Sequence, residues 1–427
     1  MHESLDRSRF DRFFDARRPA IAADLCEYIS LNTQTPHEPE CFAFLARYLE
    51  PLGAPLQTRD RHPLLSAHPD LSPHPDACTE GGPSSGFAVF ENGQGATTTT
   101  RFNAHIDVVP ASPEDPAAFE PRVDTEAIWG RGACDTKGSL VMLAEAMRFI
   151  GDEGVSAGKR VELDLPAEEE IGGNGTLSNI LYGGRVDEAI CLEPTGGEVF
   201  RGHRGCLTFS VDVVGRSVHM GEAASGVSAI EGAVAMMASL RELEGVLLQQ
   251  ARSHDAFARW EFPLSLNIGK INGGEWSGTV PERCTLVGDL GFLPTHSLED
   301  VEGLIREACA KAAEGRPGGS HRVRFHRGLR NDACLTAESA PVVEEWAELT
   351  GVPASHIAGW NVSCDARHYV HAMRVPTIVF GPGSLKHAHS AHEHVAWSEL
   401  REGAWMLAQY VARERVAGSP TDGRQAR

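Results

Sequence analysis

The first residues that suggest chemistry are three consecutive glutamates, Glu168, Glu169 and Glu170, in the stretch VELDLPAEEEIGGNG. Adjacent carboxylates repel one another, so a strand end close to a core is an unfavourable place for them. Gly172 and Gly173 follow soon after and permit a sharp backbone turn. We therefore expect a positive charge close to these three glutamates.

Further histidines and carboxylates stand at the ends of other predicted strands, where α/β sheets usually place their sites. His105 and Asp107 lie in the strand-like run 97–109, Asp135 lies in the glycine-rich turn GRGACDTKG, and Glu193 ends the run 188–193. Because residues i and i+2 of a strand point to the same side, Asp107 can accept a hydrogen bond from the distal ring N–H of His105. Such a bond fixes the tautomer of a ligand histidine.

A histidine-rich turn near the C-terminus, GPGSLKHAHSAHEHV, contains His387, His389, His392 and His394. Each of these motifs also has an ordinary interpretation, such as a surface His–Asp pair, a tight turn or a polar loop. Together, one histidine, one aspartate, two glutamates and a second histidine on five strand ends suit a dinuclear metal site. Imidazole and carboxylate ligands fit zinc, and equally manganese or cobalt.

The motifs HIDVVP, GRGACDTKG, EEEIGGNG, LEPT and GPG…AHSAHE occur in this order along the chain. In kind and order they resemble the M20 family of metallopeptidases and deacylases, particularly its acetylornithine deacetylase and succinyl-diaminopimelate desuccinylase group. The resemblance extends over nearly the whole chain. It implies a hydrolase that uses two divalent metal ions, zinc first and cobalt or manganese as alternatives, to cleave an amide bond with metal-activated water.

The resemblance also implies a role for each matching residue. Glu169 would be the general base, which takes a proton from the attacking water and passes it to the leaving amine. Asp107 would orient a ligand histidine, and His219, in GRSVHMGEAASGVSAIE, would reach the partner subunit's site and help stabilise the oxyanion. The alternative for His219 is a hydrogen-bonded surface histidine. The implied metal ligands are His105, Asp135 as the bridging carboxylate, Glu170, Glu193 and His389.

Two positions depart from the family pattern. Relatives commonly carry an asparagine and an arginine that hold a substrate carboxylate where this chain has Gly278 and Gly291. Arg367, in CDARHY, is a candidate replacement anchor for such a carboxylate, with a structural ion pair as the equal alternative. Gly383 is expected to shape a turn near the substrate.

The elements that position these residues follow from hydrophobic periodicity. Residues 1–205 and 330–427 alternate apolar strand-like runs with helical segments, which predicts an α/β domain with helices on the faces of a sheet. The resemblance implies that this is the catalytic domain, zinc-peptidase-like, with a mixed sheet flanked by helices. Residues 206–329 read strand, helix, strand, strand, helix, strand, the ferredoxin-like order. They predict an inserted second domain, and the resemblance to the M20 family implies that it serves as a lid and dimerisation domain. Residues 57–85 are expected to be an irregular loop, and the tail after Ala417 to be disordered.

Composition narrows the partners. The 427-residue chain has a formal net charge of −20, which disfavours nucleic acid and anionic membranes as partners. Its start has no apolar signal region, and no stretch approaches a membrane span. The ten cysteines include no C-x-x-C pair, so reduced thiols in a cytoplasmic protein are expected.

The leading functional hypothesis is a homodimeric amidohydrolase that deacylates an N-acyl amino acid or a related amine. The alternative is a carboxypeptidase or dipeptidase acting on a small peptide. A non-catalytic, metal-stabilised binding protein is disfavoured, because such a protein has no need of a base at Glu169. A phosphate-binding loop at GRGACDTKG lacks the G-x-x-x-x-G-K-[ST] spacing.

Overall fold

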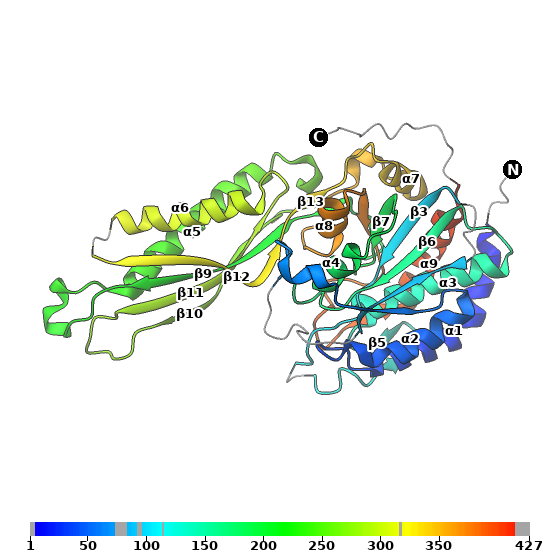
Figure 1. Ribbon diagram of the computed structural model, residues 1–427, viewed down its shortest axis with the longest axis horizontal. Coiled ribbons are helices and arrows are strands. Elements are labelled where there is room, and N and C mark those ends of the chain that lie inside the picture. Colours follow the sequence, from blue (N-terminus) through cyan, green and yellow to red (C-terminus); the bar gives the residue numbers. More distant parts are fainter. Residues whose placement is uncertain (1–4, 73–82, 92–95, 113–114, 316–317, 415–427) are drawn as a thin grey trace.

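The computed structural model describes residues 5–72, 83–91, 96–112, 115–315 and 318–414 (Figure 1). A larger part, called the body below, is built around a six-stranded sheet. A smaller part, called the lobe, comprises residues 205–331 and extends to one side of the body, as Figure 1 shows. Within the described residues, no helix is long and apolar enough to cross a membrane.

The sheet of the body is mixed, with the strand order β1-β2-β6-β3-β7-β14. The last four strands in this order are parallel to one another. At the other edge, β2 pairs antiparallel with β6, and β1 pairs antiparallel with β2. The strands are β1 (Gln57–Asp60), β2 (Pro83–Val89), β6 (Lys159–Leu165), β3 (Thr98–Asn103), β7 (Glu188–Cys191) and β14 (Thr377–Val379).

Helices cover both faces of this sheet, which explains the near-continuous apolar runs of its central strands. In β7, Ile190 joins the core on one face, whereas Ala189 and Cys191 join the core on the other. The first face carries α1 (Arg7–Ser30), α2 (Phe42–Leu49), α3 (Gly138–Asp152), α7 (Pro341–Thr350) and α9 (Trp397–Ala412). The second face carries α4 (Asn174–Leu181) and α8 (Ala366–His368).

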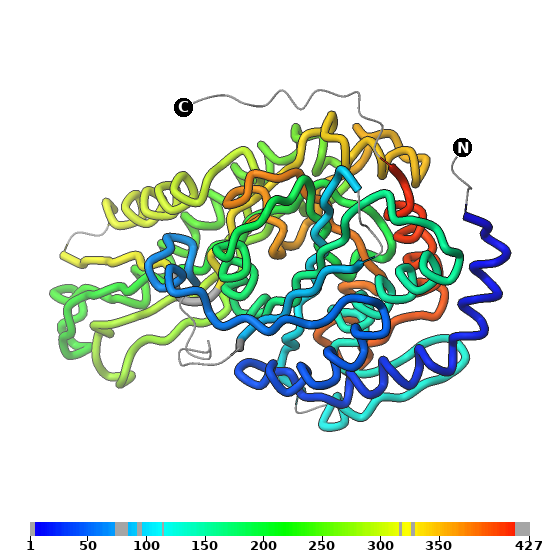
Figure 2. The backbone as a smooth tube through the Cα atoms, turned by 45° about the vertical axis from the view of Figure 1, so that its right-hand side comes forward, coloured from blue at the N-terminus to red at the C-terminus, as the bar shows by residue number. Residues whose placement is uncertain are grey.

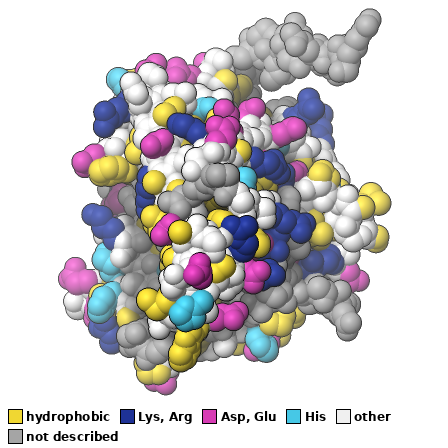
Figure 3. Space-filling view, turned by 90° about the vertical axis from the view of Figure 1, so that its left-hand side faces the viewer, with side chains coloured by type: hydrophobic (Ala, Val, Ile, Leu, Met, Phe, Trp, Pro, Cys, Tyr) yellow, Lys and Arg dark blue, Asp and Glu magenta, His cyan; other side chains and the backbone are white. Residues whose placement is uncertain are grey.

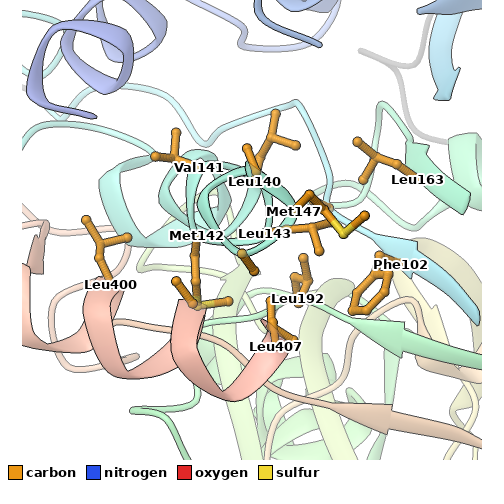
Figure 4. Close-up of a cluster of buried hydrophobic side chains, with 14 of the residues drawn as sticks. Phe102, Leu140, Val141, Met142, Leu143, Met147, Leu163, Leu192, Leu400 and Leu407 are labelled. Carbon is orange, nitrogen blue, oxygen red and sulfur yellow. The ribbon is translucent and has the colours of Figure 1, made fainter. Parts of the chain in front are cut away.

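The core of the body is centred on α3 and α9, which pack against each other on the same face of the sheet (Figure 4). Met142 of α3 faces Leu400 and Leu407 of α9, whereas Leu192 and Phe102 approach from the sheet side. Gly403 permits this close approach, because a Cβ there would overlap the sulfur of Met142. Figure 2 shows α9, in red, on the same side of the body as the N-terminal α1, in blue, which it contacts.

The lobe has the predicted ferredoxin-like order. Its elements are β9 (Gly205–Val214), α5 (Ala229–Ala251), β10 (Leu266–Gly273), β11 (Arg283–Phe292), α6 (Leu298–Glu314) and β12 (Ser320–Asn331). The strands pair antiparallel in the order β10-β11-β9-β12, and α5 and α6 pack against them around a separate apolar core. Short strands β8 (Gly202–His203) and β13 (Cys334–Leu335) pair where the chain enters and leaves the lobe.

Several elements differ from the sequence prediction. The strand expected at 97–109 ends at Asn103, so His105 and Asp107 lie in the loop that follows it. The loop expected at 57–85 contains β1, whose polar sequence QTRD gives no apolar signal. A small sheet of β15 (His394–Ala396), β5 (Ala127–Trp129) and β4 (Arg122–Val123) was not predicted, because strands this short have no readable period. The tail after Ala417 lies outside the described residues.

Candidate metal centre

Three adjacent parallel strands bring three of the sequence motifs together. β3 pairs with β6 on one side and with β7 on the other, so that Asn103 lies between Asp164 and Cys191. The loops after these strands carry His105, the glutamate run and Glu193. Because the carboxyl ends of parallel strands lie at the same edge of a sheet, these side chains face one another.

The described residues contain one group of side chains with metal-ligand geometry: the potential ligand atoms of His105, Asp135 and Glu170 all lie within 4.8 Å of one another. Nε2 of His105 lies 2.9 Å from Oδ1 of Asp135. Nε2 of His389 lies 3.2 Å from Oδ2 of Asp135 and 3.0 Å from Oε1 of Glu170. The two carboxylate oxygens of Asp135 therefore face two different histidines.

Asp107 organises both the histidine and the glutamate run. Nδ1 of His105 donates to the main-chain carbonyl of Asp107 at 3.0 Å, and the carboxylate of Asp107 is farther from Nδ1, at 3.5 Å. That carboxylate instead accepts hydrogen bonds from the main-chain amides of Glu169 (3.1 Å) and Glu170 (2.9 Å). The expected carboxylate–imidazole bond is thus replaced mainly by a carbonyl contact, which still leaves Nε2 free to act as a ligand.

Glu168 does not face solvent. Its side chain is buried, pairs with Arg61, and accepts a hydrogen bond from Nδ2 of Asn174 at 3.0 Å. Among the described residues, Glu168 and His389 are two of the three non-glycine residues with left-handed backbone angles, each with φ of 62°. Strained backbone of this kind is concentrated at functional sites.

The carboxylates of the centre are crowded. Burial, followed by the charge of Asp365, raises the pKa of Glu169 well above its usual range. Burial, followed by the charge of Glu169, does the same to the pKa of Glu193, whose Oε1 is buried and has no hydrogen-bond partner in the part of the chain that the structure describes. Burial and Asp135 raise the pKa of Glu170. The centre therefore holds more negative charge than the described residues around it neutralise.

The histidines show the opposite response. Burial opposes the charged form of His105, but Asp107 and Asp135 raise its pKa well above the ordinary value. Likewise, Asp135 and Glu170 raise the pKa of His389 to about 11 against the effect of burial. In both cases the carboxylates attract whatever positive charge is available. A divalent cation supplies that charge directly, so the donor set and its electrostatics fit divalent metal ions.

Glu393 is a contributor that the sequence interpretation missed. It is buried, pairs with Nη1 of Arg131 at 2.6 Å, and its Oε1 lies 3.4 Å from the main-chain nitrogen of Asp135. It follows directly after the histidines of AHSAHE, so its place in that motif was the available signal. In the described part of the chain, the other histidines of the turn form no hydrogen bond with Asp135 or Glu170. The ring centroids of His387 and His394 lie 4.4 Å apart, and His392 is exposed.

His219 lies in the lobe, away from this centre. β9 begins beside the body and, at about 3.3 Å per residue, carries the chain roughly 30 Å to Val214. His219 follows this far end, is exposed, and accepts a hydrogen bond from the amide of Gly221 at 3.1 Å. Figure 3 views the molecule from this side, where histidine, charged and apolar side chains are interspersed.

The proposed substrate residues have varied surroundings. Arg367 is buried, and its Nη1 and Nη2 donate to the carbonyls of Cys364 (2.7 Å) and Gly172 (2.9 Å). It thereby supports the turn after the glutamate run. Gly383 has φ of 79°, and a Cβ there would overlap that of Cys134. It allows the turn after β14 to approach the Asp135 loop.

Gly291, one of the two lobe glycines that depart from the family pattern, lies against an arginine that was not among the predicted site residues. A Cβ at Gly291 would overlap Nη1 of Arg204, so the guanidinium of Arg204 occupies the space beside this glycine. Nε of Arg204 donates to the carbonyl of Asn361. Gly278 instead faces the indole of Trp276, whose Nε1 would lie 2.9 Å from an added Cβ. The contact of Arg204 with Gly291 depends on tertiary structure and has no local signal in the sequence.

Comparison with known proteins agrees with this geometry. The model of peptidase family M20/M25/M40 matches residues 101–413. An acetylornithine deacetylase of Aliivibrio fischeri is 28% identical over 300 residues, which cover 69% of this chain and 75% of that relative.

Solved structures show the same fold at low sequence identity. A tripeptidase of Staphylococcus aureus superposes with a TM-score of 0.70 and 17% identity, covering 92% of this chain and 97% of its own. A Bacillus subtilis protein described as a dinuclear metal-binding peptidase superposes with a TM-score of 0.60 and 14% identity, covering 92% and 98%.

Proposed function

Because the chain belongs to peptidase family M20/M25/M40 and is a metallohydrolase, we propose that it removes the acyl group from an N-acyl amino acid or a related amine. The observation that carries this proposal is the arrangement around Asp135, whose two oxygens face His105 and His389 beside Glu170. The nature of the acylated amine is inferred from the acetylornithine deacetylase relative.

Five residues would hold two divalent metal ions: His105, Asp135, Glu170, Glu193 and His389. A carboxylate with one oxygen toward each histidine suits a bridging ligand, and the unpartnered Oε1 of Glu193 suits a terminal one. Zinc is the first expectation, with cobalt or manganese as alternatives, because this ligand set is permissive. When bound, such ions polarise a carbonyl group and lower the pKa of water.

Glu169 is the proposed general base. Its main-chain amide and that of Glu170 both donate to Asp107, which holds the backbone of the two residues in place. The carboxylate would take a proton from the attacking water and return it to the leaving amine. A pKa raised by burial and by Asp365 makes this carboxylate a stronger base, whereas a nearby dication lowers the pKa again.

His219 is proposed to act in a partner subunit. Its position beyond the far end of β9 gives it no short path to the centre of its own chain. A homodimer formed through the lobe would bring it to the other chain's centre, where it would stabilise the oxyanion. Exposed apolar side chains concentrated on the lobe support such an interface: Met220, Ile230, Val234, Val246, Phe262, Ile271 and Trp276.

Recognition of a substrate carboxylate is proposed to fall to Arg204 rather than to Arg367. The donors of Arg367 are directed at two main-chain carbonyls, and its guanidinium is buried. Arg204 is only partly buried and lies over Gly291, at the junction of lobe and body. Gly383 would shape the wall of the site next to Cys134.

A carboxypeptidase or dipeptidase is the alternative within the same chemistry, because one site of this kind can cleave either amide.

A reducing, cytoplasmic location remains a prediction, which the nine free cysteines among the described residues fit.

A substrate panel tests the proposal. The full-length protein is reconstituted with zinc, cobalt or manganese and assayed on acylated ornithine, lysine and diaminopimelate beside dipeptides and tripeptides. Deacylation at least about tenfold more efficient than peptide cleavage is expected, a difference of about 1.4 kcal/mol in transition-state stabilisation. Preference for the peptides would replace the deacylase assignment by the peptidase one.

Mixed dimers of His219→Ala and Glu169→Gln subunits, each inactive alone, should recover activity if His219 acts across the interface.

A further inference from the structure

A second charged cavity lies where the lobe meets the body, apart from the metal ligands. Its volume is about 40 Å³, it is open to solvent on one side, and its charged and histidine lining comes from both parts. β12 reaches this junction from the lobe, beside β13 and α8 of the body (Figure 1). The lining side chains of interest are Asp70, Arg330, Asp332, Arg367, His368 and His371.

Arg330 has unused hydrogen-bonding capacity. Its Nη1 lies 3.9 Å from Asp70 and its Nη2 lies 3.6 Å from Glu302, both beyond hydrogen-bond distance. Its Nε is buried and has no hydrogen-bond partner among the described residues. A buried donor left without a partner costs about 1–3 kcal/mol, so such donors are normally satisfied by water or a ligand.

His368 also has a buried nitrogen without a hydrogen-bond partner among the described residues. The residue is 4% exposed, and the nitrogen is Nε2. The nearest acidic oxygen, Oδ1 of Asp365, lies 4.0 Å away. Burial, followed by the positive charges of Arg367 and neighbouring histidines, lowers the pKa of His368 well below its usual value. The surroundings of Nε2 therefore favour an incoming negative group over a proton.

Among the remaining lining groups, two aspartates add negative charge to the cavity. Arg367 is fixed by two carbonyls, and His371 donates from Nε2 to the carbonyl of Ala333 at 2.9 Å. Asp70 and Asp332 contribute carboxylates on the same cavity. One oxygen of Asp332 accepts from the amide of Ala333 at 2.9 Å. A simple anion would meet these two aspartates as well as the two arginines.

We propose that this cavity binds the zwitterionic head of an α-amino acid, with its carboxylate at Arg330 and His368 and its ammonium group at Asp70 and Asp332. Such a ligand offers an acceptor to the Nη groups of Arg330, which have no acidic oxygen within hydrogen-bond distance, and balances the mixed charge of the lining. It also bridges the lobe to the body, because Arg330 and Asp332 come from the lobe strand and the connection that follows it, whereas Asp70 and His368 belong to the body.

The head group can come from two sources: the substrate or product of the enzyme, or a free amino acid that regulates it. Assignment to the substrate rests on the proposed function, whereas binding itself does not. Binding is therefore measured first, on the full-length metal-free protein, so that no metal chelates the probe.

The probes are L-alanine, propanoate and ethylamine, which share a small carbon skeleton but carry both charges, the carboxylate or the ammonium group alone. Calorimetry is expected to show L-alanine binding at least about tenfold more tightly than either single-charge probe, since each charged hydrogen bond contributes about 1.5–3 kcal/mol. Arg330→Gln and Asp332→Asn should each weaken alanine binding about tenfold or more. Arg322→Gln, at an exposed position on the same strand, should bind as the wild type does.

The outcomes separate cleanly. Absence of alanine binding, equal binding of propanoate, or unchanged binding by folded Arg330→Gln protein would overturn the proposal. Thermal unfolding establishes that each variant is folded, and Asp332→Asn provides the test if Arg330→Gln is not. In the metal-loaded enzyme, a KM effect of Arg330→Gln confined to substrates with a free α-amino acid head identifies the substrate as the source. A change in turnover of all substrates on adding alanine identifies a regulator.

Discussion

The body and the lobe treat charge in opposite ways. Among the described residues of the lobe, no charged side chain is buried, and its core is apolar. The body buries many, including Arg101, Arg131, Lys137, Glu145, Lys159, Asp164 and Glu188. Buried charges are costly unless paired, so a fold retains them where they position something. The body is thus built around a polar centre, whereas the lobe is a scaffold whose possible roles lie on its surface and at its junction with the body.

The largest expected effect concerns one body carboxylate. Glu169→Gln removes the proposed base but keeps the volume and the main-chain bond to Asp107. Turnover should fall by about 10²–10⁴ while the metal content stays near that of the wild type. Steady-state kinetics and elemental analysis measure the two quantities. Glu402→Gln, at the surface, is the control, and substantial turnover by Glu169→Gln would exclude Glu169 as the base.

A matched pair of core substitutions separates the two parts. Phe209 in β9 and Phe102 in β3 are both fully buried, so Phe209→Ala and Phe102→Ala should each cost about 3–5 kcal/mol of unfolding free energy. Only Phe102→Ala is expected to weaken metal binding, because β3 leads directly to His105. Urea denaturation and metal titration report these effects. Equal loss of metal affinity in both variants would show that the lobe core also determines the centre.

Glu38 tests the cost of buried charge in the body. Burial raises its pKa to about 7 despite a hydrogen bond from Thr35 at 2.6 Å. Since the folded pKa exceeds the unfolded value of 4.5, stability falls as pH rises from about 4.5 to about 7. Glu38→Gln should therefore be more stable than the wild type by up to about 3 kcal/mol at pH 8.

The same difference should shrink to about 0.4 kcal/mol at pH 4.5, where the folded wild-type carboxyl is protonated and the unfolded one is half protonated. Urea unfolding at pH 4.5, 6 and 8 measures this trend. A constant difference across that range would mean that the mutation acts through packing rather than through ionisation.

The smallest expected effect on the fold concerns the lobe surface. Ile271→Asp, at a 52% exposed position on the edge strand β10, should change monomer stability by no more than about 0.5 kcal/mol. If the lobe forms the proposed dimer interface, light scattering should show dissociation. Val352→Asp, an exposed position in the body, should leave the mass unchanged. A wild-type protein that is itself monomeric would remove the trans role of His219.

Local patterns sufficed for much of this molecule. The alternation in β9 and β11 and the helical spacing of α6 predicted the ferredoxin-like order, and the strand-end motifs identified residues that the fold brings into one group. The missing parts depend on contacts between distant segments. Glu168 pairs with Arg61, and Arg204 lies over Gly291; in neither case does the sequence near one residue indicate the other. Asp107 could be placed beside His105, but its bonds to the two glutamate amides require the folded loop.

The junction between the two parts has a consequence for the history of the chain. Where the chain enters the lobe, Cys206 is paired with Asn331, at the point where the chain leaves it. Residues paired across antiparallel strands have Cα atoms only about 5 Å apart. Excising the residues between them would leave two ends that a short turn can join, and it would also remove Trp260, which stacks on Phe200 and donates to the carbonyl of Gly359 in the body. A single insertion between these two points would account for the presence of the lobe.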